Sequence, residues 1–236
     1  MAERFTVVPL TPLRKIIAAR MTDAARTIPH FRLVADIDMD ATLGLRRKLN
    51  AELSANTISV NACIVKACAA ALVEHPAINS QMMGNEIHQY RQADISVIIA
   101  VEGGLFSPVI RQANQKSVRD IAIEIQALAA RAAEGRLRME EILGGSFSVS
   151  NLGGHGVDQF DAIINPPQCA ILAVGRARPR VIVCGSGETR IANILRATLS
   201  VDHRAIDGAM AAAFMNTLRV TLEQPQRLFA AGTDGG

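Results

Sequence analysis

A histidine and an aspartate four residues apart stand where a predicted strand runs into a helix near the end of the sequence. The stretch SVDHRAIDG places His203 at the end of the strand, and Asp207 with Gly208 at the start of the helix. A histidine held there by polar neighbours can act as a general base near neutral pH. An aspartate at a helix N-terminus stays ionised because of the helix dipole. The same spacing also fits a surface turn in which Asp207 only caps the helix, so both interpretations remain open.

The serines of the stretch GSFSVSNLGGHG form a second candidate group. Ser146, Ser148 and Ser150 fall on one face of a predicted strand, because side chains alternate along a strand. A hydroxyl at the strand end, beside glycine-rich backbone, can donate a hydrogen bond to a developing oxyanion. The alternative is an edge strand with a polar face. His155 lies between glycines and is interpreted as a solvent-facing loop residue. The chain has no G-x-S-x-G elbow, which argues against a nucleophilic serine of the α/β-hydrolase kind.

The cysteines and histidines show no metal-binding or redox spacing. The cysteines lie in apolar runs without a C-x-x-C pair, which predicts reduced thiols in the core of the protein. They are Cys63, Cys68, Cys169 and Cys184. The five histidines are far apart along the chain, so we expect no zinc site and no other metal.

The composition of the 236 residues is that of a globular protein. A hydrophobic share of 49% and a charged share of 20% exclude a disordered or fibrous chain. The net charge of +3, with one Tyr and no Trp, does not favour binding to nucleic acid. No apolar run reaches the ~18 residues of a membrane span, and the start has no secretory signal. We therefore expect neither a nucleic-acid nor a membrane partner.

The elements that must position these residues are helices and strands in a mixed order. Helices are expected over 11–28, 40–53, 60–75, 117–134 and 207–224, with Thr11, Asp40, Ser59, Ser117 and Asp207 as N-caps. Strands are expected over 31–39, on both sides of the glycines at 103–104, and over 145–152, 168–175, 178–185 and 192–202. The helix over 60–75 is apolar on most faces and should be buried. Runs of strands with helices set apart predict an α+β fold in one domain, followed by a frayed tail.

Four motifs together resemble a known family. TPLRKIIAARM, SFSVSNLGGHG, INPPQCAILAVG and SVDHRAIDG occur in the order found in the acyltransferases of the 2-oxo acid dehydrogenase complexes. The resemblance spans about residues 8–229, which looks like the catalytic core domain of these enzymes. The H-x-x-x-D-G pattern is shared with chloramphenicol acetyltransferase. The resemblance therefore implies a single acyltransferase domain over 1–236, with a chloramphenicol acetyltransferase-like mixed sheet, flanking helices and a trimeric assembly.

The resemblance also implies a reaction. An acyl group, taken as acetyl from the SNLG and INPPQCAILAVG motifs, passes between dihydrolipoamide and coenzyme A in a pyruvate-type complex. His203 would remove the proton of the attacking thiol, because a thiol is mostly protonated at neutral pH. Ser150 would bind the oxyanion of the tetrahedral intermediate. Asp207 matches the acidic position of the family, and Arg20 matches its salt-bridge partner, a pair that would hold the His203 loop. Ser150 of one subunit would face His203 of its neighbour.

Partners follow from the same resemblance. No D-K-A type lipoylation site and no peripheral-subunit-binding domain precede the core, so lipoamide would be carried on another domain or chain. The expected partners are at least two further copies of the chain, with a larger cage left open, the lipoyl-bearing domain, and the decarboxylase and dihydrolipoamide dehydrogenase components. The compartment would be the cytoplasm, or the mitochondrial matrix in a eukaryote. Arginines at 176, 178, 180, 190 and 196 are candidates for the phosphates of CoA, although solvated sheet edges explain them better.

Two alternatives to this enzyme remain open. One is a stand-alone CoA-dependent acyltransferase with a hydroxyl or amine acceptor. The other is a trimeric scaffold that holds partner enzymes and has lost its activity. The presence of both His203 and Ser150 argues against the scaffold.

Overall fold

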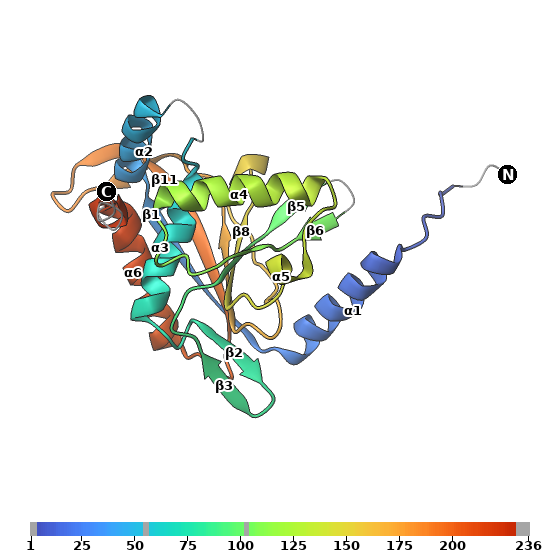
Figure 1. Ribbon diagram of the computed structural model, residues 1–236. Coiled ribbons are helices and arrows are strands. Elements are labelled where there is room, and N and C mark those ends of the chain that lie inside the picture. Colours follow the sequence, from blue (N-terminus) through green and yellow to red (C-terminus); the bar gives the residue numbers. More distant parts are fainter. Residues whose placement is uncertain (1–3, 54–56, 102–103, 230–236) are drawn as a thin grey trace.

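The computed structural model describes residues 4–53, 57–101 and 104–229, and its main sheet is mixed (Figure 1). Its strands follow the order β1-β11-β9-β8-β4-β7, and β10 pairs with the first half of β11. β8 runs parallel to both β4 and β9, whereas the other pairs are antiparallel. The strands are β1 (His30–Asp38), β4 (Ile95–Val97), β7 (Val109–Ile110), β8 (Phe147–Asn151), β9 (Ala170–Val174), β10 (Arg178–Val183) and β11 (Thr189–Asp202). The predicted α+β class with a mixed sheet is confirmed.

Helices α3, α4 and α6 cover one face of the sheet, and α1 stands away from the body of the molecule (Figure 1). The helices are α1 (Pro12–Thr27), α2 (Asp40–Glu52), α3 (Val60–Glu74), α4 (Val118–Ala133), α5 (Met139–Ile142), α6 (Gly208–Glu223) and α7 (Gln226–Phe229). A 3₁₀ turn covers Gly153–His155. Two separate hairpins pair β2 (Ser80–Met83) with β3 (Glu86–Gln89), and β5 (Ile99–Val101) with β6 (Gly104–Phe106).

Side-chain caps start most of the long helices, as the sequence predicted. The confirmed caps are Thr11, Ser59, Ser117 and Asp207. The prediction that Asp40 caps α2 is wrong. The N-cap is Met39, and Asp40 lies inside the first turn. Its carboxylate instead accepts the backbone N–H and the side-chain amide of Asn193, at 3.1 and 2.7 Å, and so ties α2 to β11.

The predicted strand pattern was too simple in two places. The segment over 94–110 forms four short strands rather than two, and Gly103 of its expected turn lies outside the described residues. The β2–β3 hairpin was not predicted, because all four residues of β3 are exposed and show no apolar alternation. Its turn does carry a signal, since Gly84 has a φ of 63°, a conformation that favours glycine. The expected frayed tail over 230–236 also lies outside the described residues.

The two faces of the sheet differ in polarity, as the strand register shows. Residues in register across neighbouring strands point to the same face. One such row across β8, β9 and β11 is buried under the helices and consists of Val149, Leu172 and Leu199. The next row includes Ser150 and Thr198 and faces the opposite side. The serines of β8 therefore lie on the face away from the main core, in a central strand rather than at an edge.

The helical layer contains the thiols that the sequence placed in the core. The predicted burial of the 60–75 helix is confirmed, since ten residues of α3 are buried. Burial raises the pKa of the Cys63 thiol to about 12 and also raises that of Cys68. Cys169 is buried as well, whereas Cys184 is partly exposed, and all four are unpaired thiols. The prediction of reduced core thiols therefore holds for three of them.

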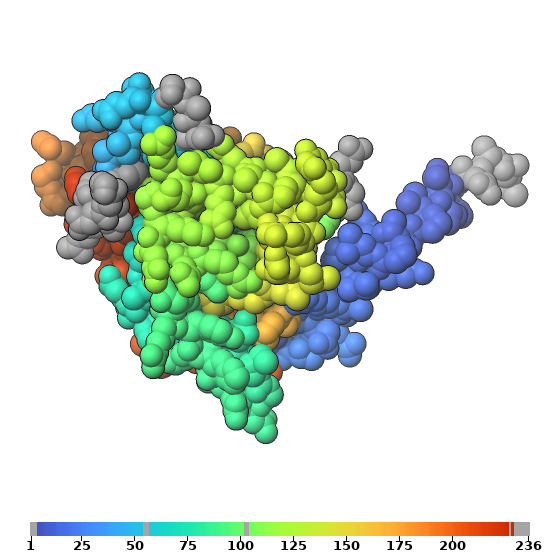
Figure 2. Space-filling view, in the orientation of Figure 1, coloured from blue at the N-terminus to red at the C-terminus, as the bar shows by residue number. Residues whose placement is uncertain are grey.

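The N-terminal segment leaves apolar side chains uncovered. The space-filling view shows this segment and α1 projecting from the rest of the chain (Figure 2). Phe5, Val8 and Ile16 are 70%, 80% and 65% exposed. Exposed apolar surface of this kind marks a contact with another molecule. No helix in the described ranges is long and apolar enough to cross a membrane.

Candidate active site

His203 directly follows β11, and hydrogen bonds hold the backbone around it. Its own N–H donates to the carbonyl of Pro29 at 3.0 Å, and the N–H of Ala205 donates to the carbonyl of Asp202 at 3.0 Å. The imidazole lies against Phe31, with 4.8 Å between the ring centroids and an angle of 52° between the ring planes. The side chain of His203 is exposed. The turn therefore presents an accessible imidazole from a well-fixed backbone.

Asp207 and Arg20 do not form the ion pair that the sequence suggested. The carboxylate of Asp207 accepts the N–H of Met210 at 2.9 Å and so caps α6. Arg20 donates from α1 to the carbonyl of Pro166. The described residues of one chain contain no ion pair between Arg20 and Asp207, so this prediction is wrong for the single chain. The reason is that α1 extends along the side of the sheet that carries the Ser150 pocket and the β5–β6 hairpin, and its Arg20 meets the loop before β9 there.

Ser146, just before β8, and Ser148 and Ser150 within it have different environments. Ser146 and Ser148 are fully buried. The Ser146 hydroxyl donates to Oδ1 of Asn79 at 2.6 Å, and the Ser148 hydroxyl donates to Oε1 of Gln168. Ser150, near the C-terminal end of the strand, is partly exposed and lines a pocket. The pattern of alternate serines thus combines two structural hydroxyls with one that a substrate can reach.

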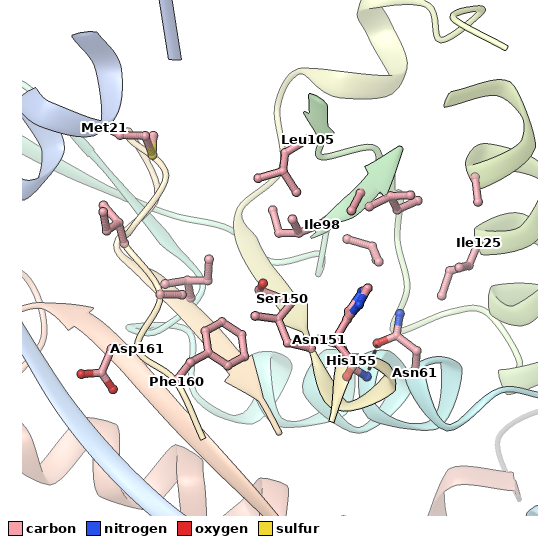
Figure 3. A pocket seen from close by; sticks show the side chains of 18 residues that line it. Met21, Asn61, Ile98, Leu105, Ile125, Ser150, Asn151, His155, Phe160 and Asp161 are labelled. Atoms are coloured by element: carbon pink, nitrogen blue, oxygen red, sulfur yellow. Dashed lines mark hydrogen bonds between the residues drawn. The ribbon is translucent and has the colours of Figure 1, made fainter. Parts of the chain in front are cut away.

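The pocket beside Ser150 has a volume of about 620 Å³ and is mostly apolar. Its side chains come from α1, α3, α4, strands β4, β5, β6, β8 and β9, and the segment over 152–163, and Ser150 lies in their middle (Figure 3). One part of the wall is polar: the amide of Asn151 donates to Oδ1 of Asn61 at 3.2 Å, and its Oδ1 accepts the N–H of Gly153 at 2.9 Å. His155 is exposed, as predicted, but it also lines this pocket.

Ser150 and His203 lie at opposite ends of the sheet. Ser150 is in register with Ala173 of β9, which is in register with Thr198 of β11. His203 follows five residues later, since 203 − 198 = 5, toward the N-terminal end of β8. Five residues span about 16 Å and two strand spacings about 10 Å, so the two residues are about 19 Å apart. His203 does not line the Ser150 pocket. One chain alone cannot bring the two side chains together.

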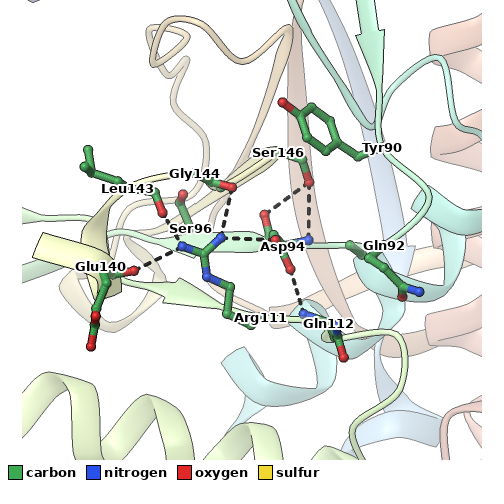
Figure 4. A network of polar contacts seen from close by, with 12 residues as sticks. Tyr90, Gln92, Asp94, Ser96, Arg111, Gln112, Glu140, Leu143, Gly144 and Ser146 are labelled. Atoms are coloured by element: carbon green, nitrogen blue, oxygen red, sulfur yellow. Dashed lines mark hydrogen bonds and ion pairs between the residues drawn. The ribbon is translucent and has the colours of Figure 1, made fainter.

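A polar network fixes the start of β8. Arg111 donates to the carboxylate of Asp94 at 3.1 Å and to the carbonyls of Glu140 and Gly144 at 3.0 and 3.1 Å (Figure 4). It also donates to the carbonyl of Leu143. The guanidinium therefore holds the loop before β8 against the start of β4. Because β8 is short, this anchor also sets the position of Ser150.

The five arginines considered for the phosphates of CoA each face a carboxylate. The pairs are Arg176 and Arg178 with Asp158, Arg180 and Arg196 with Asp36, and Arg190 with Asp38 and Asp40. Hydrogen bonds from Arg196 lower the pKa of Asp36, and those from Arg176 lower the pKa of Asp158. These arginines join β10 and β11 to β1, α2 and the loop at residue 158. Arg176, Arg178 and Arg190 remain 41–45% exposed, which fits the expected solvated sheet edge, and each already has a carboxylate as its partner.

Sequence reasoning missed the residues on both sides of His203. Asp202 is 1% exposed, and its carboxylate binds the guanidinium of Arg204. The sequence shows that Asp202 and Arg204 flank the histidine. It does not show that Asp202 is buried, which is what makes the pair significant. In the described parts of the chain, no group of three or more His, Cys, Asp or Glu side chains is arranged to hold a metal ion.

Comparison with solved structures first defines the fold. A chloramphenicol acetyltransferase aligns with 86% of this chain and 94% of its own at a TM-score of 0.55 and 14% identity, so the two share a fold. The dihydrolipoamide acetyltransferase of Azotobacter vinelandii aligns with a TM-score of 0.91 and 30% identity, over 96% of this chain and 95% of its own. The cubic core of a pyruvate dehydrogenase multienzyme complex gives 0.91 and 29% over the same shares.

Comparison of sequences then defines the family. The family model of the 2-oxoacid dehydrogenases acyltransferase (catalytic domain) matches residues 2–230, and the chain belongs to this family. It is 44% identical over 225 residues to the dihydrolipoyllysine-residue acetyltransferase component of the Zymomonas mobilis pyruvate dehydrogenase complex, covering 94% of this chain and 51% of that protein. It is 39% identical to the mouse pyruvate dehydrogenase protein X component, over 96% of this chain and 46% of that protein. The chain thus spans about half the length of these relatives.

We predict that Ser148→Ala destabilises the protein whereas Ser150→Ala does not. Removal of the Ser148 hydroxyl leaves the buried Oε1 of Gln168 without its donor, at a cost of about 1–3 kcal/mol. Ser150 is partly exposed and its loss should stay within about 0.5 kcal/mol. Urea denaturation at one fixed protein concentration measures both. Equal losses in the two variants would contradict the distinction drawn between the serines.

Proposed function

We propose that the chain is the acyltransferase domain of a pyruvate dehydrogenase complex and moves an acetyl group between dihydrolipoamide and coenzyme A. The observation that carries this proposal is the 44% identity to a relative with that activity in its name, in a chain whose motifs contain His203 and Ser150. The largely apolar Ser150 pocket with an amide-lined wall suits a long thiol-bearing arm that contains amide groups.

In the proposed reaction His203 takes the proton of the attacking thiol, whose pKa is ordinarily about 8.5. The sulfur then forms a bond to the carbonyl carbon of the thioester, and the carbonyl oxygen becomes an oxyanion. Ser150 donates a hydrogen bond to that oxyanion. When the tetrahedral intermediate collapses, the other carbon–sulfur bond breaks and His203 returns the proton to the leaving sulfur. No acyl group is attached to the protein, because both thiols meet in one site.

The relative from Azotobacter vinelandii supports these assignments. Its structure belongs to an investigation of one serine, one histidine and one asparagine in the catalytic mechanism. The asparagine follows the histidine by four positions, as Asp207 follows His203. An asparagine side chain carries no charge and cannot form an ion pair. The relative therefore indicates that an ion pair is not required at this position. We therefore propose that Asp207 contributes to the site as the cap of α6, which fixes the turn that carries His203.

We further propose that the site is shared between subunits of a trimer. The separation of about 19 Å between Ser150 and His203 along the sheet supports a site in which the two come from different copies. The exposed apolar segment with Phe5, Val8 and Ile16 offers surface for such a contact. The similarity to a cubic multienzyme core supports an assembly larger than the trimer.

The remaining partners and the compartment are part of the same proposal. A lipoyl-bearing domain would deliver the acetyl group, and the decarboxylase and dihydrolipoamide dehydrogenase components would act before and after it. Relatives come from bacteria and from mitochondria, so we propose the bacterial cytoplasm or the mitochondrial matrix. A non-catalytic scaffold that holds partner enzymes is the second candidate, and the acceptor assay below distinguishes it from the acyltransferase.

An acceptor assay tests the activity. Acetyl-CoA should transfer its acetyl group to free dihydrolipoamide, because His203 and Ser150 are proposed to act on a thiol acceptor. The release of CoA measures this transfer. An alcohol of the antibiotic type should not react. Transfer to the alcohol alone would support the stand-alone acyltransferase. The absence of both reactions in a folded trimer would support the scaffold.

Substitution of the two proposed catalytic residues should lower turnover. His203→Ala should reduce kcat by at least ~10²-fold, the scale of one general base. Ser150→Ala should cost ~10²–10³ in kcat with little change in KM, because its hydrogen bond forms mainly in the transition state. Steady-state kinetics with both thiols measure these effects, and circular dichroism checks the fold. Near-normal turnover of folded His203→Ala would remove it as the base.

A complementation experiment tests the shared site. Unfolded His203→Ala and Ser150→Ala chains are mixed in equal amounts and refolded together. If each site combines two neighbours in a closed ring, random assembly restores roughly ½ × ½, or a quarter, of the sites. Each variant refolded alone serves as the control. Mixed trimers confirmed by native mass spectrometry, but with activity no higher than the controls, would show that the site lies within one chain.

A further inference from the structure

The side chains on both sides of His203 bind each other. Nε of Arg204 lies 3.0 Å from Oδ1 and 3.2 Å from Oδ2 of Asp202, and Nη2 lies 2.6 Å from Oδ2. The backbone N–H of Arg204 donates to the same Oδ1 at 3.0 Å. Residues 202 and 204 are thus joined through both main chain and side chain, and His203 is the residue between them.

This pairing fixes the direction in which His203 leaves the backbone. Asp202 is 1% exposed, whereas His203 is exposed, so the two side chains leave the chain on opposite sides. The N–H of Asp202 donates to the carbonyl of Cys169 at 2.8 Å, which anchors the buried end of the turn to the start of β9. The ring of Phe31 lies against the imidazole, with 4.8 Å between the ring centroids. Rotation of the turn would have to break the bonds of the guanidinium.

The chemistry of the pair suits this task. A buried carboxylate needs a counter-charge, because water no longer stabilises it. The planar guanidinium of arginine binds both oxygens at once and so defines an orientation, which an ammonium group does not. The Arg204 side chain is 45% exposed, so it closes the turn from the solvent side. Neither Asp202 nor Arg204 lines the Ser150 pocket.

We infer that the Asp202–Arg204 pair is a positioning device for His203 in the thiol-transfer reaction, an inference that rests on the proposed function. The pair holds the imidazole where it meets the thiol brought to the neighbouring subunit's site, and it binds no substrate itself. Misplacement of a catalytic group by about 1 Å can cost 10²-fold in rate. Loss of the pair should therefore lower kcat and leave KM unchanged.

Three variants separate positioning from folding. Arg204→Lys keeps the positive charge but loses the planar fork. Arg204→Gln leaves the carboxylate of Asp202 buried without a counter-charge, and the double variant Asp202→Asn/Arg204→Gln removes that charge as well. Arg219→Lys is the matched control, because Arg219 pairs with Glu223 on α6, at 2.8 Å and away from His203.

We expect Arg204→Lys to lower kcat about tenfold or more, with unchanged KM for both thiols and a melting temperature near that of the wild type. Arg204→Gln should lower both kcat and the melting temperature. The double variant should regain the melting temperature but not kcat. Arg219→Lys should match the wild type. Wild-type kcat in Arg204→Lys or in the double variant would show that the pair serves folding alone. A raised KM for CoA at unchanged kcat would show that Arg204 binds substrate; either result overturns the inference.

A spectroscopic measurement tests the inference independently of activity. The NMR signals of the His203 ring, assigned by their loss in His203→Gln, should carry a ring-current shift from Phe31, since the ring centroids are 4.8 Å apart. That shift should decrease in Arg204→Lys and in the double variant. An unchanged shift in both overturns the inference. If the wild type transfers no acetyl group, the proposed function fails, and the ring shift still decides whether the pair positions His203.

Discussion

The pairing of β11 with three other strands is the constraint on which the geometry of the site depends. β11 pairs with β1 and β9 along its second half and with β10 along its first half. Fourteen residues of continuous strand therefore carry His203 to one end of the sheet, while the register through β9 leaves Ser150 near the other. A sheet held in this register cannot slide to close the gap. An active site that uses both residues must combine two chains, and the uncovered apolar segment before α1 offers surface for that contact.

The polar face of β8 imposes a second constraint. Ser148 of β8 and Ser146 just before the strand are buried on the side away from the main core, and a buried hydroxyl without a partner is costly. Ser146 and Ser148 meet this requirement with Asn79 and Gln168. Gln168 also donates to the Gly145 carbonyl at 2.9 Å, so the loop before β9 is joined to the start of β8. The same bonds that satisfy two serines hold the third, Ser150, at the pocket.

Much of the fold and part of the site were determined by local sequence. Caps at Thr11, Ser59 and Ser117 start helices because their side chains reach backbone groups within three residues. The apolar helix α3 is buried because no face of it suits water. His203 and Ser150 could be selected because each stands at a strand end beside glycine or a helix start. These features depend on residues that are close together along the chain, and the sequence gives the identity of those residues directly.

Only the tertiary structure decided which side chains meet. Arg20 binds the carbonyl of Pro166 rather than Asp207, and no pattern in the sequence predicts this partner. The arginines of β10 and β11 find carboxylates on β1, α2 and a distant loop, and the burial of Asp202 depends on the strands packed around it. The distance between Ser150 and His203 follows from strand order and register. Charges and hydroxyls choose partners by proximity in space, so alternation and capping patterns identify elements and candidate groups but not their pairs.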